Sequence, residues 1–326
     1  MTTLPINALI KLVIDTDPGI DDCHAIMMAL SSSHVQILGL TIVTGNTSLD
    51  QAIRNAHYLL HTFKRDDIPV FRGVDRALDG LQKYAPHIHG DDGFGNATLD
   101  KDIKLDLLSD EPASVALVRL ARENRGELVV AAIGPLTNIF LAHRLDPDFS
   151  RNIKRLFIMG GNCTMPHLDA LSIGFEFNFK CDPLAAAIVL EEFHTTPILV
   201  PFELAVAAPF SFHFLDEEMF SKTDKSEKAR LFNDVSQFLV DVCKNESELF
   251  GEGLVSCDSV CMACVLDDSV MIERRQIYAC VEPIGIVASG HMIADWYGHF
   301  RREPNVEIVT KIDMKKFTNL FRMCVQ

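Results

Sequence analysis

The apolar positions of this chain form short runs that alternate with segments of helical spacing. Near-continuous apolar runs predict buried parallel strands at residues 11–14, 35–43, 68–71, 128–133, 156–159 and 198–200. Helical spacing predicts helices at residues 22–30, 48–63, 112–124 and 183–190, and one ending near Arg144. Strands alternating with helices are typical of an open α/β fold whose twisted, mostly parallel sheet is flanked by helices.

The alternation is lost in the last third of the chain. Longer helices are expected at about 221–250 and 259–266, with short strands near 277–281 and 306–312. Residues 73–102 are rich in Gly, His and Asp and predict a long loop. The sequence contains no repeat and no linker, so we expect one domain over residues 1–326 with an elaborated C-terminal part.

Composition narrows the classes of partner. The 326 residues include 30 Lys and Arg against 45 Asp and Glu, a formal charge of -15, which argues against nucleic acid or an anionic membrane. A cation or a neutral polar ligand suits this charge better. No apolar run is long enough to span a membrane, no signal-peptide pattern is seen, and nine cysteines scattered through apolar segments indicate free thiols. We therefore expect a cytoplasmic protein.

Polar residues follow several of the predicted strands. Asp17, Asn46, Thr137 and Gly160-Gly161 each come where a strand ends. In open α/β sheets, ligands bind outside the carboxyl ends of the strands. Asn46 or Thr137 alone could be an ordinary turn or helix-start residue, but the topology brings them to the same rim as the aspartates.

The strand at residues 11–14 leads into Asp15 and Asp17, and a Pro-Gly turn then leads to Asp21 and Asp22. Either Asp21 or Asp22 caps a helix and the other acids are solvated, or the four carboxylates share a cation that relieves their repulsion. Oxygen ligands at this density favour calcium or magnesium.

Several other residues could belong to a functional site or have a purely structural role. His89 has a suitable pKa range for a proton donor, although loop histidines are commonly only solvated. Glu176 and Asn178 share a face if their segment is extended. Cys257, Cys261 and Cys264 have a spacing that could hold an iron–sulfur cluster, but their apolar, helical context favours packing in the core.

Asp15-Thr16-Asp17 after a strand is similar to the aspartyl pair of haloacid-dehalogenase-type phosphatases. Asp21 and Asp22 would place two further negative charges where a phosphate must bind, so this match is poor.

Six motifs together carry a resemblance that covers nearly the whole chain. They are Asp-x-Asp-Pro-Gly-x-Asp-Asp at 15–22, Thr-x-x-x-Gly-Asn at 41–46, His-Gly-x-Asp-Gly-x-Gly at 89–95, Gly-Pro-Leu-Thr-Asn at 134–138, Met-Gly-Gly at 159–161, and Glu-Phe-Asn with Asp-Pro at 176–183. In this order and spacing they resemble the inosine/uridine-preferring nucleoside hydrolases. The opening octet is the most specific of them.

The resemblance implies an open α/β fold that holds one Ca²⁺ and hydrolyses the N-glycosidic bond of ribonucleosides to ribose and free base. By the family pattern, Asp17, Asp22, the Thr137 carbonyl and Asp258 hold the metal, and Asp17 takes a proton from the calcium-bound water. The ribose contacts implied are Asp21, Asn46, Met159, Glu176 and Asn178. The resemblance also implies a homodimer or homotetramer.

The chain departs from the family pattern at two places. Cys257 stands where many members have His, and a thiol is a poorer proton donor than imidazole. This leaves Cys257 or His89 beside the leaving base. Asp169-Ala170 replaces the usual Gly-Asn before Glu176. Two alternatives therefore stay open: a hydrolase of a modified nucleoside, and a catalytically weakened nucleoside-binding homologue. The single tryptophan, Trp296, could stack on a base or pack under a loop.

Overall fold

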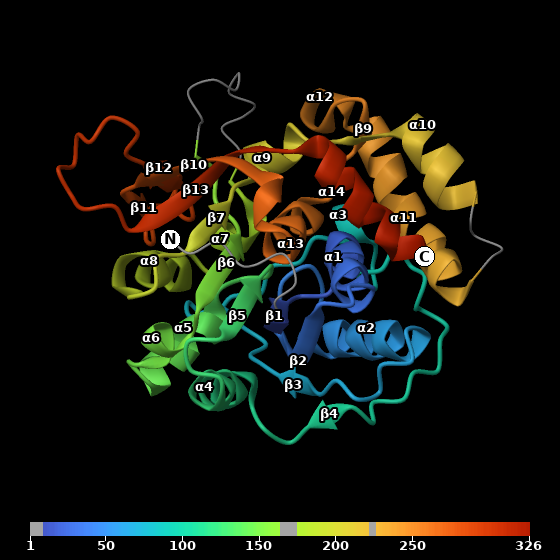
Figure 1. Cartoon of the computed structure of the whole chain (residues 1–326), viewed down its shortest axis with the longest axis horizontal. Coiled ribbons are helices and arrows are strands. Elements are labelled where there is room, and N and C mark those ends of the chain that lie inside the picture. The colour runs from blue at the N-terminus through green and yellow to red at the C-terminus, as the bar shows by residue number, and fades with distance from the viewer. Residues whose placement is uncertain (1–8, 164–174, 222–225) are drawn as a thin grey trace.

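A nine-stranded sheet organises the protein, as the computed structural model shows for residues 9–163, 175–221 and 226–326 (Figure 1). The strand order is β10-β13-β7-β6-β5-β1-β2-β3-β4. The strands are β1 (Ile10–Thr16), β2 (Val35–Ile42), β3 (Val70–Arg72), β4 (Leu108–Ser109), β5 (Leu128–Ala132), β6 (Arg155–Met159), β7 (Ile198–Val200), β10 (Met271–Ile277) and β13 (Val306–Ile312). Every neighbouring pair is parallel except β10 with β13. The predicted fold class is confirmed.

The topology places a switch point beside β1. From β1 the chain builds outward through β2, β3 and β4, and it then returns to the other side of β1 to build β5, β6 and β7. Ligands of open parallel sheets bind at such a point, where loops leave adjacent strands in opposite directions. The side chains of Leu12, Val13 and Ile14 are fully buried, which explains the continuous apolar run of β1.

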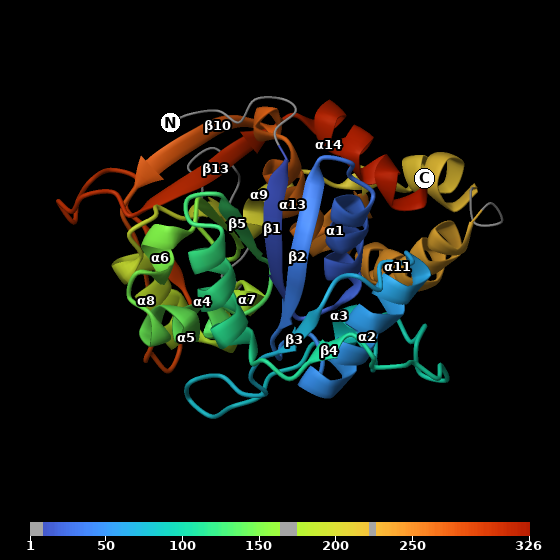
Figure 2. The same ribbon diagram turned by 60° about the horizontal axis from the view of Figure 1, so that its bottom comes forward.

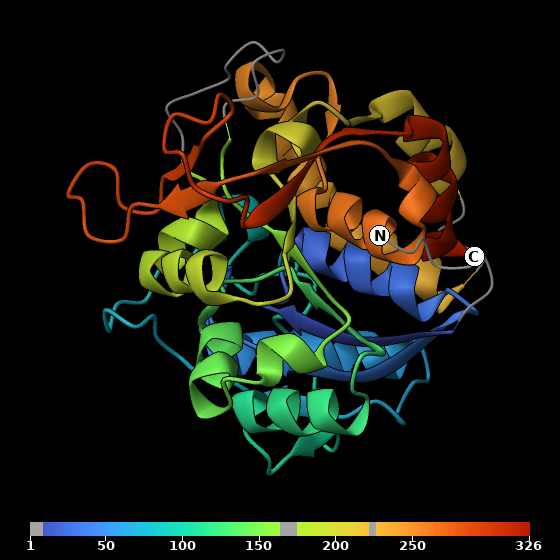
Figure 3. The same ribbon diagram turned by 60° about the vertical axis from the view of Figure 1, so that its left-hand side comes forward.

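Helices cover both faces of the sheet (Figures 2 and 3). Helix α1 packs against α13 on one face, while α4 and α8 both pack against α5 on the other. The α-helices are α1 (Ile20–Leu30), α2 (Leu49–Thr62), α3 (Pro86–His89), α4 (Ala113–Glu123), α5 (Thr137–Leu145), α6 (Phe149–Asn152), α7 (Phe177–Cys181), α8 (Pro183–Glu192), α9 (Phe202–Val206), α10 (Phe212–Phe214), α11 (Glu227–Asn245), α12 (Ser247–Phe250), α13 (Cys257–Leu266) and α14 (Met314–Phe321). None of the described helices is both long and apolar enough to cross a membrane.

Two small sheets lie outside the main one. Strands β8 (Phe210–Ser211) and β9 (Gly253–Leu254) form one antiparallel pair. Strands β11 (Ala279–Val281) and β12 (Met292–Ala294) form the other, at the periphery beside β10 and α8 (Figure 1).

The C-terminal third differs most from the prediction. The expected helix at 221–250 is wrong at both ends, because Ser226 caps α11 by accepting from the Ala229 N–H, and α11 ends at Asn245 before the separate α12. The expected strand at 277–281 is wrong as one element: Tyr278 separates β10 from β11, which belong to different sheets. The long loop at 73–102 contains the one-turn helix α3.

The helix α14 is fixed to the body by aromatic packing. Phe321 is fully buried, stacks on Phe210 with ring centroids 4.0 Å apart, and meets Phe232 edge-on at 5.7 Å. We expect Phe321→Ala to lower the free energy of unfolding by about 3–5 kcal/mol, since it removes a buried ring and leaves a cavity. Urea unfolding measures this. Lys315→Ala, on the exposed side of α14, is the control and should change little.

Candidate active site

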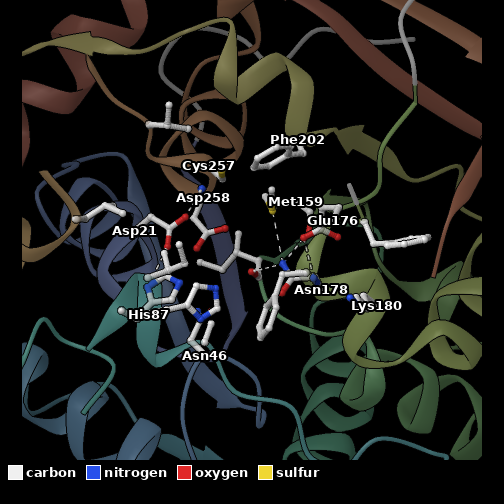
Figure 4. Close-up of a pocket in the computed structure, with 18 of the residues that line it drawn as sticks. Asp21, Asn46, His87, Met159, Glu176, Asn178, Lys180, Phe202, Cys257 and Asp258 are labelled. Carbon is white, nitrogen blue, oxygen red and sulfur yellow. Dashed lines mark hydrogen bonds and ion pairs between the residues drawn. The ribbon is translucent and has the colours of Figure 1, made fainter. Parts of the chain in front are cut away.

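A pocket of about 520 Å³ opens at the carboxyl ends of the central strands. Asn46 follows β2, Ile133 follows β5 and Met159 ends β6, and all three line the pocket. Asp21 and Asp258 enter it from the first turns of α1 and α13. Figure 4 shows these two acids on one side of the pocket and Met159, Glu176 and Asn178 on the other. The volume lies in the range of small-molecule sites.

The turn between β1 and α1 holds Asp22 in a fixed position. The Gly19 N–H donates to Asp22 Oδ2 over 2.9 Å, so Asp22 closes the N-terminus of α1. Thr16 Oγ1 donates to Asp22 Oδ1, and Asn46 Nδ2 donates to Asp22 Oδ2 over 2.9 Å. Burial, followed by the charge of Asp21, raises the pKa of Asp22 to about 6.

Asp17 is fully buried at the floor of the same corner. Its Oδ2 accepts from the Asn46 N–H over 2.7 Å, whereas no described residue is a hydrogen-bond partner of Oδ1. A Cβ on Gly45 or Gly134 would lie 1.9 or 2.7 Å from the Asp17 carboxylate oxygens, so only glycine fits at these positions. Burial, followed by the charge of Asp22, raises the pKa of Asp17 well above its usual range.

The packing of α13 on α1 brings a further acid, Asp258, to the corner. Carboxylate oxygens of Asp21, Asp22 and Asp258 lie within 4.8 Å of one another. Burial and then the charges of Asp21, Asp22 and Asp17 raise the pKa of Asp258 well above its usual range. Clustered, desolvated carboxylates repel each other, and a cation stabilises them. This donor set, with the partnerless Asp17 Oδ1, fits a hard divalent cation.

His89 reaches the pocket from α3. Its Nδ1 accepts from the Ile20 N–H over 3.1 Å and lies 3.9 Å from Asp21 Oδ1. A neutral ring whose Nδ1 is an acceptor carries its proton on Nε2. Burial lowers the pKa of His89, so the neutral form dominates near pH 7.

The opposite wall is built around the buried carboxylate of Glu176. This side chain accepts from the main-chain N–H groups of Gly161 (3.0 Å), Asn178 (2.7 Å) and Phe179 (2.9 Å) and caps α7. Asn178 Nδ2 donates to the carbonyls of Ile133 (2.9 Å) and Met159 (3.2 Å). The segment is not extended throughout, since Asn178 lies in the helix that Glu176 caps, and both side chains nevertheless line the pocket.

Comparison with known proteins decides the family. The sequence profile of the family described as inosine-uridine preferring nucleoside hydrolase matches residues 12–319. The chain belongs to this nucleoside hydrolase family. The resemblance carried by the six sequence motifs is therefore confirmed.

Individual relatives agree with the family profile. Probable uridine nucleosidase 1 from Oryza sativa subsp. japonica is 31% identical over 287 residues, which are 87% of this chain and 85% of that protein. Probable uridine nucleosidase 2 from Arabidopsis thaliana is 40% identical over 181 residues, and this match spans 55% of each chain. The solved structure of the plant nucleoside hydrolase PpNRh1 superposes with a TM-score of 0.86 at 26% identity and covers 97% of this chain and 99% of that one.

Within this member of the family, eight of the predicted site residues line one pocket. They are Asp21, Asn46, His89, Met159, Glu176, Asn178, Cys257 and Asp258. Asp17 and Asp22 are buried at its acidic end, where Asn46 contacts both carboxylates. Thr137 lines a separate small cavity, and its hydroxyl donates to Asp182 over 2.7 Å. Its predicted metal ligand is the carbonyl, which stays a prediction.

The pocket also contains residues that sequence reasoning missed. Phe202 from α9, Leu239 from α11 and Lys180 from α7 line it. Their backbone segments meet only in the tertiary structure, so local patterns carry no signal for them. Asn162 supports the pocket wall from behind and could have been found: it follows the Met-Gly-Gly motif, and its side-chain oxygen accepts from the Glu176 N–H.

For Cys261, Cys264 and Trp296, the structure favours a packing role over a role in binding. Cys261 and Cys264 are fully buried in α13, as expected for core thiols. Cys257 lines the pocket, and burial followed by the charge of Asp21 raises its pKa, which keeps it a thiol. Trp296 donates its ring N–H to the Cys163 carbonyl over 2.8 Å, which supports a structural role. The predicted departure at Asp169-Ala170 lies outside the described residues.

Gly19 is the position at which a single methyl group would disturb two pocket side chains. A Cβ there would lie 2.5 Å from Asn46 Nδ2 and 2.7 Å from His89 Nδ1. We expect Gly19→Ala to lower kcat/KM about 10²-fold, because displacements near 1 Å in a preorganised site have effects of that size. Steady-state kinetics on a ribonucleoside measures it. A thermal melt within a few degrees of wild type would show that the loss reflects the site; unchanged kcat/KM would contradict the packing argument.

Proposed function

We propose that this protein hydrolyses the N-glycosidic bond of ribonucleosides and releases ribose and the free base. The observation that carries the proposal is one pocket with a cluster of buried acids at one end and the Glu176–Asn178 wall at the other. Family membership supports the same reaction. The acidic end suits a cation and a positively charged transition state, while the polar wall suits sugar hydroxyls.

We also propose that the cation is Ca²⁺. Asp22 and Asp258, with Asp17 and the Thr137 carbonyl, would hold it, and Asp21 lies in one cluster with Asp22 and Asp258. Six to eight flexible oxygen ligands are typical of calcium, and such a mixed set of carboxylate, carbonyl and substrate oxygens meets that demand. When bound, the ion supplies charge that lowers the pKa of water and orients the sugar hydroxyls.

The proton from the attacking water goes to Asp17 in this proposal. Its Oδ1 has no hydrogen-bond partner among the described residues, whereas Oδ2 is fixed by the Asn46 N–H. As the water oxygen bonds to C1′ of the ribose, the C1′–N bond breaks and its electron pair leaves with the base. The sugar passes through an oxocarbenium-like state, as in O-glycoside hydrolysis, and the surrounding carboxylates stabilise its positive charge.

Two pocket side chains, those of His89 and Cys257, are candidates for contact with the leaving base. His89 presents an Nε2–H in its neutral form, which can donate a hydrogen bond to developing negative charge on the base. Cys257 remains a weak thiol donor. We propose that His89 stabilises the departing base and that Cys257 shapes its surroundings. The ring of a pyrimidine or purine delocalises the rest of the charge.

Uridine is the first substrate to test, since two relatives are named as uridine nucleosidases. A reducing-sugar assay over uridine, cytidine, inosine, guanosine and adenosine with Ca²⁺ present should show ribose release from at least one. Release from none of them, with nucleoside binding retained in a calorimetric titration, would overturn hydrolysis and favour the binding homologue. We also propose that the protein is cytoplasmic and forms a homodimer or homotetramer.

A further inference from the structure

His24 is a fully buried histidine in the otherwise apolar part of α1 that follows Asp21 and Asp22. Its ring centroid lies 5.0 Å from that of Phe232, and the ring meets Phe321 edge-on at 5.5 Å. The side chain does not line the pocket, so the proposed reaction makes no direct use of it. A buried imidazole nevertheless needs a hydrogen-bond partner at each of its nitrogens.

Hydroxyl groups from two other segments bind both ring nitrogens of His24. Nε2 lies 2.8 Å from Ser236 Oγ of α11, and Nδ1 lies 3.1 Å from Ser256 Oγ. Burial lowers the pKa of His24 to about 3, so the ring is neutral. The Ser236 hydroxyl donates its hydrogen to the Phe232 carbonyl, so it accepts from the ring, and the ring proton lies on Nε2. Nδ1 therefore accepts from the Ser256 hydroxyl.

Ser256 is the residue through which His24 contacts α13. It is the N-cap residue of that helix, a position whose serines commonly accept from a helical N–H, yet its side chain forms no capping hydrogen bond to the described residues of α13. Its hydroxyl is directed at His24 instead. Cys257 and Asp258 follow directly, so the bond acts where α13 brings Asp258 to the acidic cluster. A second contact from the same face of α1, the Asp258 N–H to Asp21 Oδ2, is 3.5 Å long and therefore weak.

We propose that His24 is a positioning residue: by holding Ser256, it sets the distance between Asp258 on α13 and Asp22 on α1. These two helices pack against each other (Figure 1). The clustered carboxylates repel one another, and the hydrogen bond behind them resists their separation. Residues that orient metal ligands from behind contribute roughly 10–100-fold to metal affinity. The effect on Ca²⁺ rests on the proposed function, whereas the placement of Asp258 does not.

Two substitutions of His24 separate positioning from stability. Asn carries a carbonyl oxygen near the position of Nδ1 and can still accept from Ser256, whereas Gln carries an amide nitrogen near the position of Nε2 and can only donate to Ser236. Calorimetry should show that His24→Gln weakens Ca²⁺ binding at least about 10-fold and that His24→Asn stays within about threefold of wild type. Both variants lose one hydrogen bond and the ring packing, so their melting temperatures should fall by similar amounts. Equal losses of Ca²⁺ affinity would overturn the proposal, because a role in stability alone predicts them.

Ser256→Ala removes the same bond and keeps the histidine, so it tests the proposal even if a His24 variant does not fold. It should weaken Ca²⁺ binding about 10-fold. Ser150→Ala is the matched control, because Ser150 is also fully buried, its hydroxyl lies 3.3 Å from the His194 ring, and it does not line the pocket. Its Ca²⁺ affinity should equal that of wild type, and a Ser256→Ala protein with the same affinity as this control would overturn the proposal.

Crystal structures of the cation-free variants test the geometry without relying on the proposed function. The carboxylates of Asp22 and Asp258 should lie farther apart in His24→Gln and Ser256→Ala than in wild type, and their separation should be unchanged in Ser150→Ala. An unchanged separation in the first two variants would overturn the positioning role. Wild-type protein that binds no Ca²⁺ would overturn the proposed cofactor alone, since these structures would still decide what His24 does.

Discussion

Asp17→Asn is expected to lower kcat at least about 10³-fold, within the range for loss of a general base, and to change KM only a few-fold. An amide has nearly the shape of a carboxylate, so Asn can keep the hydrogen bond that Oδ2 now accepts from the Asn46 N–H. What it loses is the capacity of Oδ1 to take a proton. Because burial and Asp22 already raise the pKa of Asp17, removing its charge should leave the metal-free protein at least as stable.

Asp15→Asn is the matched control for this prediction. Asp15 lies two residues away and is equally buried, but its Oδ1 accepts from Thr41 Oγ1 (2.6 Å) and Asn138 Nδ2 (2.9 Å). Those bonds survive an amide, so kcat of this variant should stay within about tenfold of wild type. Steady-state kinetics on uridine and thermal melts measure both variants. An Asp17→Asn enzyme with more than a tenth of wild-type kcat would show that another group accepts the proton.

The central sheet was predictable because its strands are buried on both faces. A short, continuous apolar run is typical of such a strand. The predicted bounds lie within a few residues of those observed for β1, β2, β5 and β6. The edge strand β10 was missed since its sequence, Met-Ile-Glu-Arg-Arg-Gln-Ile, places charged residues on exposed positions of an antiparallel edge. The break between β10 and β11 arises because the two strands belong to different sheets, and no local sequence pattern indicates this.

The site was predictable to the extent that strand ends define it. Asp17 and Asn46 follow adjacent parallel strands, so elementary topology already brings them together. Asp258 is different: its place beside Asp22 depends on the packing of α13 against α1, and only the family resemblance indicated it. The helical cap at Glu176 was missed because it depends on hydrogen bonds from two main-chain N–H groups of α7 to the Glu176 carboxylate, and side-chain periodicity does not indicate them.

Removal of divalent cations is the second change with a large expected effect. Protein dialysed against EGTA should lose at least about 10³-fold in activity, since the charge that activates water in a metal hydrolase is then missing, and added Ca²⁺ should restore it. Ca²⁺ should also stabilise the fold by about 2.7 kcal/mol at 100 times its dissociation constant, which a thermal melt measures. The reason is the repulsion among Asp17, Asp22 and Asp258, whose pKa values burial and mutual charge raise.

The same raised pKa values set the direction of the pH dependence. In the cation-free protein these carboxyls bind protons at higher pH than free carboxyls do, and the cation must displace those protons. Affinity for Ca²⁺ should therefore fall as pH drops from 8 toward the Asp22 pKa of about 6. Calorimetry in two buffers of different ionisation enthalpy should record proton release at neutral pH.

Two variants test whether the stabilisation by Ca²⁺ depends on the acidic cluster or on the overall negative charge of the protein. Asp258→Asn removes one of three clustered acids and should abolish the Ca²⁺-dependent shift in melting temperature. Asp295→Asn is the control, because its carboxylate accepts from the N–H groups of His299 (2.7 Å) and Phe300 (2.8 Å) and does not line the pocket. Equal Ca²⁺ shifts in the two variants would place the cation elsewhere. Full activity after EGTA treatment would mean that the buried acids themselves, partly protonated, stabilise the reacting sugar without a cation.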